Sequence, residues 1–311
     1  MAIRPAQEHP KPQAKTIRYQ IRHVTTYQYS DHVSVCFNRA WLSPRELSHV
    51  QVLDHRITTA PSTTTENFER DFFGNKVFTF SVEQEHSKLV VTASSILEIT
   101  QAPESQTTSP AWEDVSRMIG NFTEPSWFDA RRFQTASPRI PLQEEFAKFA
   151  RDCFPQGRPI LEAVDELTER IYKQFEYNTT ATTVETNPLD ALTHRKGVCQ
   201  DFAHVQIAAL RSMGLPARYV SGYLRTLPPP GKPRLIGADQ SHAWVSVYCG
   251  PDLGWIDFDP TNNVRCGLDH LTLAWGRDYS DVAPIKGVCL GGGIPLLNVE
   301  VDVVELPHDA N

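Results

Sequence analysis

The sequence predicts an α+β protein in which a small β domain precedes a part that is helical first and rich in strands afterwards. Strand-like alternation fills residues 16–101, two helical periodicities follow between residues 142 and 175, and a helix at 199–213 comes before short apolar runs. Strand and helix patterns therefore occupy separate stretches of the chain, which is typical of α+β folds with antiparallel sheets.

The first domain, residues 16–101, is predicted to be all β. Residues 17–22 alternate apolar and polar side chains, and residues 77–82 and 89–93 are rich in β-branched side chains. Between two of the apolar runs, Gly-Asn supplies a turn because both residue types tolerate positive φ. Residues 1–15 are polar and contain prolines, so we expect a disordered tail in front of this domain.

The second domain, residues 102–311, is predicted to begin with a polar linker that extends to about residue 110. Apolar side chains then recur at helical spacing in two segments: Leu142, Phe146, Phe149, Ala150 and Cys153, and Leu161, Val164, Leu167, Ile171 and Phe175. A third helix, 199–213, is closed by Gly214 with Pro216 beyond it. Strands are expected at 218–224, 243–249, 255–258 and 298–303.

The composition is that of an ordinary globular protein, with 311 residues, 40% of them hydrophobic and 22% charged. The net charge is −7 and the 30 Lys and Arg residues are scattered, so we expect no nucleic-acid partner. No stretch reaches the roughly 20 apolar residues of a membrane span, so we expect no membrane partner either. The six cysteines are widely spaced and form no CxxC pair, which favours free thiols and a cytoplasmic location.

Cys199 is the first candidate for chemistry. It lies at the predicted start of a helix, directly after Gly197-Val198, where unpaired backbone N–H groups and the helix dipole favour a thiolate. The same N–H groups could stabilise an oxyanion beside the sulfur. The alternative is a small buried apolar residue, which is what most single cysteines are.

His242 and two aspartates are the candidates for a base and its orienting group. His242 lies at the head of a predicted strand, from which it could reach a helix N-terminus across a cleft. Asp257 and Asp259 share a face of the next strand, and either could receive the imidazole N–H. Each signal has an alternative, a loop histidine or a turn-capping aspartate, but a thiol-based acyl transfer needs this combination.

Four separated segments resemble the core of the transglutaminase-like family, in the order of that family. They are Gly197-Val198-Cys199-Gln200-Asp201-Phe202-Ala203-His204, Ala217-Arg218-Tyr219-Val220-Ser221-Gly222-Tyr223, Ser241-His242-Ala243-Trp244-Val245 and Asp259-Pro260-Thr261-Asn262. The strand-rich start and the segment Gly276-Arg277-Asp278-Tyr279-Ser280-Asp281-Val282 resemble the bacterial members. The resemblance implies a papain-like core, in which the helix that carries the cysteine packs on an antiparallel sheet, and a triad of Cys199, His242 and Asp259.

The resemblance also implies attack of Cys199 on a peptide or carboxamide carbonyl, followed by resolution of a thioester. Hydrolysis is preferred over γ-glutamyl crosslinking to an amine, and a catalytically silent scaffold of the same fold is the third alternative. A peptide or protein substrate is expected, whereas the oligomeric state stays open. Tyr177 is a candidate oxyanion donor, with a packed core aromatic as the preferred alternative, and Trp244 is expected to cover the cleft wall.

No cofactor and no metal are expected. The calcium that animal members use would need an Asp-rich loop, which the sequence lacks. Zinc held by Cys199, His204, His242 and Asp259 would lack a ligand pair at metal spacing. His204 lies too far round its helix from Cys199 to act as a second base, so we expect it to pack or to face solvent.

Overall fold

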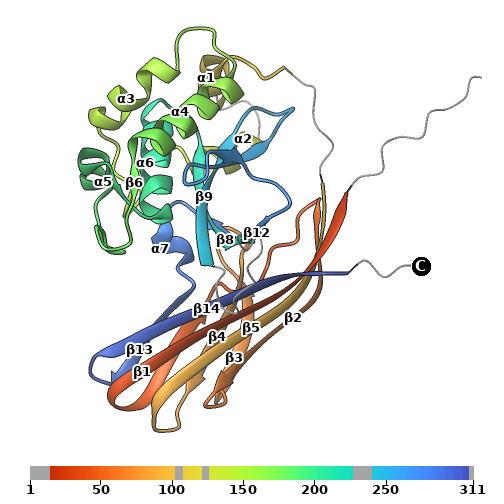
Figure 1. Cartoon of the computed structure of the whole chain (residues 1–311), viewed down its shortest axis with the longest axis vertical. Coiled ribbons are helices and arrows are strands. Elements are labelled where there is room, and N and C mark those ends of the chain that lie inside the picture. Colours follow the sequence, from red (N-terminus) through yellow and green to blue (C-terminus); the bar gives the residue numbers. More distant parts are fainter. Residues whose placement is uncertain (1–14, 102–107, 121–125, 227–239, 308–311) are drawn as a thin grey trace, which may run out of the picture.

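The computed structural model describes residues 15–101, 108–120, 126–226 and 240–307. It consists of a helical part built around a short sheet and, beneath it, a long curved antiparallel sheet (Figure 1). The predicted α+β architecture is confirmed. Most of the expected disordered tail, residues 1–14, lies outside the described residues, as do residues 102–107 of the expected linker.

The lower sheet is organised around one exceptionally long strand, β1 (Thr16–Ala40). Four more strands from the first hundred residues join it: β2 (Val50–Ala60), β3 (Thr65–Arg70), β4 (Lys76–Val82) and β5 (His86–Thr100), in the order β2-β5-β1-β4-β3. The predicted strands at 17–22, 77–82 and 89–93 all lie within these elements. The predicted turn between β3 and β4 has Gly74 at φ 74°, in the left-handed region that favours glycine.

Two strands from the other end of the chain complete this sheet. β13 (Ile285–Gly291) and β14 (Pro295–Leu306) both pair antiparallel with β1. The strand expected at 298–303 therefore exists. It pairs with β1 of the predicted first domain, although residues 102–311 were predicted to form the second domain. Local alternation predicts that a segment is a strand, whereas its partner depends on long-range packing.

The helices gather between the two ends of the chain. They are α1 (Trp112–Gly120), α2 (Ser126–Arg131), α3 (Glu144–Ala150), a short 3-10 turn (Arg151–Cys153), α4 (Ile160–Gln174), α5 (Pro188–His194), α6 (Cys199–Ser212) and α7 (Tyr279–Val282). The two predicted periodic segments correspond to α3 with the 3-10 turn and to α4. The predicted helix at 199–213 is α6, which is buried along almost its whole length.

The second sheet packs against α6 and has the order β11-β10-β9-β8-β12. Its strands are β8 (Ala217–Leu224), β9 (Gln240–Tyr248), β10 (Trp255–Asp259), β11 (Val264–Arg265) and β12 (His270–Gly276). A short parallel pair, β6 (Glu176–Tyr177) and β7 (Lys196–Gly197), leads into α6. All pairs in the five-stranded sheet are antiparallel, as expected for the helix-then-strand order.

A continuous apolar core joins the two sheets. Tyr19 and Ile21 of β1 and Val301 and Val303 of β14 belong to the same buried cluster as the residues around α6. Burial of large apolar side chains is the main source of stability, so this shared core holds the two parts together.

Asn75, in the predicted turn, adds a polar link between the parts. It is fully buried, its Nδ2 donates to the carbonyl oxygen of Trp275 (2.8 Å), and its Oδ1 accepts from the Trp275 N–H (3.0 Å). The turn therefore docks the lower sheet on β12. None of the described helices is long and apolar enough to cross a membrane.

Candidate active site

Cys199 is the first residue of α6, and two neighbours shape the chain before it. The Asp201 carboxylate accepts the Val198 N–H (2.8 Å) and the Thr182 hydroxyl (2.7 Å), which ties the helix start to the preceding loop. A Cβ at position 197 would lie 2.6 Å from Asp201 Oδ2, so only glycine fits there. The half-buried Cys199 thiol thus lies at the N-terminal end of the helix, as predicted.

His242 lies near the start of β9, opposite Gly222 of β8. Its Nε2 is 2.8 Å from Asp259 Oδ2, so Nδ1 is the ring nitrogen left for a second partner. His242 and Cys199 line the same cavity, whose volume is about 590 Å³. The structure therefore brings together the three residues that were singled out from separate segments of the sequence.

The register between β9 and β10 explains why Asp259, and not Asp257, contacts His242. Asp257 is directly opposite Ser246, and its Oδ2 accepts the Nε1–H of Trp244 (2.9 Å), two residues further along. Asp259 stands in the same diagonal relation to His242. Both aspartates do share a face, as alternation predicts, but each has a different partner.

Asp259 is fully buried and accepts five hydrogen bonds. Its Oδ2 accepts hydrogen bonds from His242 Nε2, His270 Nε2 (3.1 Å) and Asn262 Nδ2 (2.7 Å). Its Oδ1 receives the backbone N–H groups of Thr261 (2.9 Å) and Asn262 (3.3 Å). A buried carboxylate needs this many donors to remain charged.

His270 is the residue that the sequence analysis missed. It lies at the head of β12, packs edge-on against Trp244 with ring centroids 5.3 Å apart, and donates to the same oxygen as His242. The available signal was a histidine at the head of another strand, in the position that made His242 a candidate. Asn262 belonged to the resembling Asp-Pro-Thr-Asn segment but was given no role.

The electrostatics of His242 and Asp259 favour an ion pair. Burial alone would lower the pKa of His242, but hydrogen bonds and the charges of Asp259 and Cys199 outweigh it and raise the pKa to about 10. Burial would raise the pKa of Asp259, but the bonds from His242, His270 and Asn262 hold it well below its usual range. At neutral pH the geometry supports an imidazolium between a buried carboxylate and the Cys199 sulfur.

Trp244 does not line the cavity that holds Cys199, so its expected place in the cleft wall is wrong. Its side chain is fully buried behind His242 and His270, and its indole N–H bonds to Asp257. Gly222, which lies opposite His242 on β8, leaves the space for the indole: a Cβ there would lie 2.4 Å from the Trp244 ring. Trp244 supports the two imidazoles from behind instead.

Tyr177 lies beside the start of α6, because β6 pairs with β7 and places Tyr177 opposite Gly197. It is half-exposed, and its ring contacts Phe202 edge-on at a centroid distance of 6.2 Å. Partial burial raises its pKa, and the nearby Cys199 and Asp201 add to this. The ring therefore packs on α6 within electrostatic range of the thiol, and its use as an oxyanion donor stays a prediction.

The described residues contain one group that could hold a metal ion. One ligand atom from each of His242, Asp259 and His270 lies within 4.8 Å of the other two. The hydrogen bonds from the two imidazoles to Asp259 account for this proximity without a metal. His204 is not part of the group: it is buried, accepts the Tyr279 N–H (3.2 Å), and burial lowers its pKa to about 3. Of the two expected outcomes, packing is the correct one.

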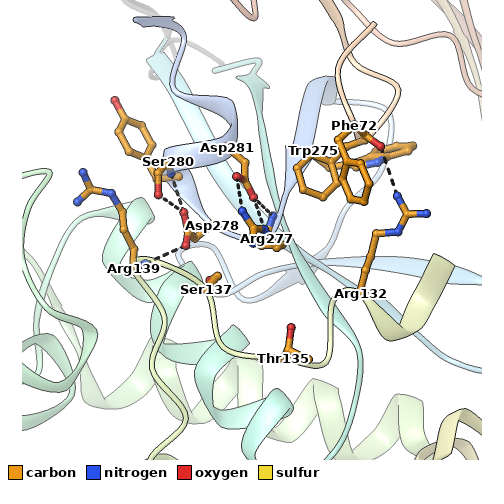
Figure 2. Close-up of polar contacts among 12 residues, drawn as sticks. Phe72, Arg132, Thr135, Ser137, Arg139, Trp275, Arg277, Asp278, Ser280 and Asp281 are labelled. Atoms are coloured by element: carbon orange, nitrogen blue, oxygen red, sulfur yellow. Dashed lines mark hydrogen bonds and ion pairs between the residues drawn. The ribbon is translucent and has the colours of Figure 1, made fainter. Parts of the chain in front are cut away.

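Figure 2 shows the segment around α7, which resembled bacterial family members without a predicted role. Arg277 forms an ion pair with Asp281 (Nε to Oδ2, 2.9 Å), and Asp278 accepts the backbone N–H of Arg139 (2.9 Å). These contacts fix the loop after β12. The fixed loop places Tyr279, the first residue of α7, in the lining of the cavity.

Two family models match the chain. The model described as the transglutaminase-like superfamily matches residues 147–260, and the one described as the bacterial transglutaminase-like N-terminal region matches residues 19–98. The chain belongs to the transglutaminase-like superfamily. An uncharacterized protein of Mycobacterium tuberculosis is 37% identical to this transglutaminase-like chain over 309 residues, which cover 96% of each.

Two further comparisons cover different parts of this transglutaminase-like chain. A protein-glutamine gamma-glutamyltransferase of Pseudomonas aeruginosa is 36% identical over 110 residues, 33% of this chain and 16% of that protein. A solved structure from Cytophaga hutchinsonii, described as a "putative cysteine protease", superposes with a TM-score of 0.74 at 22% identity and covers 96% of this chain and 93% of its own. The latter confirms the fold over both sheets.

Proposed function

We propose that this chain is a cysteine-dependent acyl-transfer enzyme that acts on peptide or carboxamide bonds. The observation that carries the proposal is that Cys199, at the start of α6, shares a cavity with His242, whose imidazole is bonded to the fully buried Asp259. A nucleophile, a base and a group that fixes the base are the parts that this chemistry needs.

In the proposed reaction, the Cys199 thiolate attacks the carbonyl carbon and the carbonyl oxygen becomes an oxyanion. Backbone N–H groups at the start of α6 stabilise that oxyanion, with the Tyr177 hydroxyl as a candidate additional donor. The C–N bond then breaks, and the His242 imidazolium gives its proton to the leaving amine. This leaves a thioester on Cys199 and a neutral imidazole.

Water is the proposed acceptor. The neutral His242 takes a proton from water as the oxygen attacks the thioester, the C–S bond breaks, and a carboxylic acid and the original cysteine are released. Asp259 holds the imidazole with Nδ1 toward the sulfur in both steps. A second candidate, transfer of the acyl group to an amine, is favoured by the likeness to the Pseudomonas gamma-glutamyltransferase.

The first test compares the reactivity of the six free thiols toward iodoacetamide at neutral pH. Cys36, Cys153 and Cys249 are buried, whereas Cys289 is exposed and Cys199 is only half-exposed. Cys289 is the natural control, because accessibility alone would make it react first. We expect peptide mapping to show that Cys199 reacts first, and equal or faster modification of Cys289 would contradict the proposal.

The acceptor is tested by incubating the purified protein with a peptide library, with and without a primary amine, and measuring product masses. Hydrolysis of a peptide bond, deamidation of glutamine and amine incorporation give different mass changes. Amine incorporation that exceeds hydrolysis would replace water by the amine in the proposal. Loss of all products in Cys199→Ser, with selective iodoacetamide labelling kept in the wild type, would tie them to this thiol, whereas unchanged products would favour a contaminant.

The enzyme is also proposed to work in a reducing compartment such as the cytoplasm. The reaction needs Cys199 as a free thiolate, and oxidation to a disulfide or sulfenic acid would block the attack. Restoration of labelling by a thiol reductant after mild oxidation is the expected behaviour. Full labelling after the same oxidation would remove the reason for this location.

A further inference from the structure

The cavity that contains Cys199 is built from both sheets. Cys199 and His242 contribute from α6 and β9, and the opposing wall comes from β1 and β14 of the lower sheet. Figure 1 shows this sheet running beneath the lower ends of β8 and β9, and β14 contacts β9. The N-terminal β region is thus part of the candidate site.

Three directly opposed pairs form this wall. They are Tyr27 with Leu297, Thr25 with Val299, and His23 with Val301. Because directly opposed residues of antiparallel strands point to the same face, all six side chains face the cavity side of the sheet. The wall therefore continues without interruption across both strands.

The wall changes from a buried floor to an exposed rim. His23, Thr25 and Val301 are buried, whereas Leu297 is 54% exposed and Val299 is 43% exposed. Large apolar side chains at a rim remain in contact with water until another apolar group covers them. Covering the rim next to Cys199 with apolar substrate atoms is therefore energetically favourable.

Among the described residues, the cavity offers no free partner to a charged side chain, because its one cation, the His242 imidazolium, is already paired with Asp259. None of the described residues that line it is Asp, Glu, Lys or Arg. His23 is neutral at pH 7, because burial lowers its pKa to about 4, and its ring nitrogens bond to Thr25 Oγ1 (2.7 Å) and Tyr223 Oη (3.0 Å). A charge placed here would lose its hydration without a compensating partner.

We propose that the acyl donor is a polypeptide segment with a large uncharged apolar side chain close to the attacked carbonyl, and that this side chain packs on Tyr27, Leu297 and Val299. The proposal rests on the proposed function, because it places the substrate by the position of Cys199. It assigns substrate selection to the N-terminal β region and the last strand, while the reacting groups come from α6, β9 and β10.

The test uses peptidyl acyloxymethyl ketones, which alkylate cysteine nucleophiles, in a set that differs only in one side chain: Leu, Ser, Asp or Lys at each of three positions. The rate of Cys199 modification is followed by intact mass. At one position we expect the wild type to react with the Leu probe at least about tenfold faster than with the Asp probe, as apolar pockets discriminate.

Leu297→Lys supplies a cation at the rim and should reverse the preference, so that the Asp probe reacts faster than the Leu probe. Leu296→Lys is the matched control. Leu296 is 72% exposed, but it points to the opposite face and does not line the cavity. The Leu296→Lys variant should therefore keep the wild-type preference for the Leu probe over the Asp probe. The ratio of two rates within one variant is independent of any general loss of activity.

Two failures are distinguishable. If Cys199 of the wild type shows no selective reaction with iodoacetamide or with any probe, the proposed function itself is wrong. If Cys199 reacts selectively but Leu, Ser, Asp and Lys probes react alike at all positions, or if both lysine variants change the preference equally, the apolar wall does not select the substrate.

Discussion

Replacing Asp259 by Asn removes the charge that holds His242 as an imidazolium while keeping the size of the side chain. The pKa of His242 is raised from 6.5 to about 10, which corresponds to about 5 kcal/mol in favour of the charged form. Asp259 and Cys199 supply this together against burial. The hydrogen bond to Asp259 is the largest contribution that raises this pKa, so its loss lets burial lower the pKa of His242 and depletes the imidazolium.

The Asn side chain also favours the wrong tautomer. Its amide N–H can donate to Nε2 of His242, which leaves the proton on Nδ1, the nitrogen on the Cys199 side. Loss of orientation by such an exchange costs about 10⁴-fold in serine-protease triads. We therefore expect a decrease of about 10²- to 10⁴-fold in rate for Asp259→Asn, which is the range that general acid–base catalysis contributes.

Iodoacetamide alkylation of Cys199 at pH 6 measures the effect of Asp259→Asn on the reactivity of the thiol without a known substrate. Free thiols are almost entirely protonated at that pH, so fast alkylation needs the neighbouring imidazolium. In Asp259→Asn, burial is no longer offset by the carboxylate, the pKa of His242 falls, and alkylation slows. A peptidyl acyloxymethyl ketone gives the same comparison for the attack on a carbonyl-bearing probe.

Asp257→Asn is the matched control. Asp257 lies on the same strand and face, but it binds the indole of Trp244 rather than His242. We expect its alkylation rate at pH 6 to stay near that of the wild type. An Asp259→Asn rate that falls no further than the Asp257→Asn rate would refute the view that Asp259 sets the charge state of His242.

Three further predictions concern buried polar groups. His270→Phe removes a hydrogen-bond donor that lowers the pKa of Asp259, so the acid limb of the pH profile of Cys199 alkylation should move to higher pH. His270→Gln keeps a donor and should restore the wild-type profile, whereas equal profiles for wild type and His270→Phe would contradict this. His23 must take up a proton on unfolding between pH 6.5 and about 4, so stability should fall by about 3 kcal/mol across that window, and urea midpoints of His23→Gln should show a smaller fall. Asn75→Ala should cost about 2–4 kcal/mol in urea unfolding by leaving buried backbone groups unpaired, whereas the exposed Asn67→Ala should cost little.

Several elements were predictable because their signals are local. The alternation at 17–22 and the helical spacing at 161–175 reflect side chains that face one core, so the pattern survives in the sequence. The helix that begins at Cys199 was predicted for the same reason, with Gly214 at φ 77° after its end. The prediction of Cys199 as the nucleophile followed from that position together with the resembling segments.

The site was predictable only as far as its residues lie in recognisable segments. His242 and Asp259 were found, but His270 was not. It contacts Asp259 only because the sheet has the strand order β10-β9-β8-β12, which the sequence does not reveal. Trp244 shares a face of β9 with His242, as alternation predicts, but it is fully buried against the rings of His242 and His270, and this depth depends on the packing around it.

The sequence by itself determined the two fold segments, the helix that carries Cys199 and the candidate triad, since these depend on local periodicity and on short motifs. Alternation left Asp257 and Asp259 both open and only the resemblance favoured Asp259; the tertiary structure supplies the physical reason, because the register of β9 against β10 brings Asp259 to His242 and Asp257 to Trp244. It also decided that β14 pairs with β1, so that Tyr27 and Leu297, from opposite ends of the chain, form one wall beside the thiol. Pairing between distant strands is fixed by the packing of the whole core, and no short stretch of sequence encodes it.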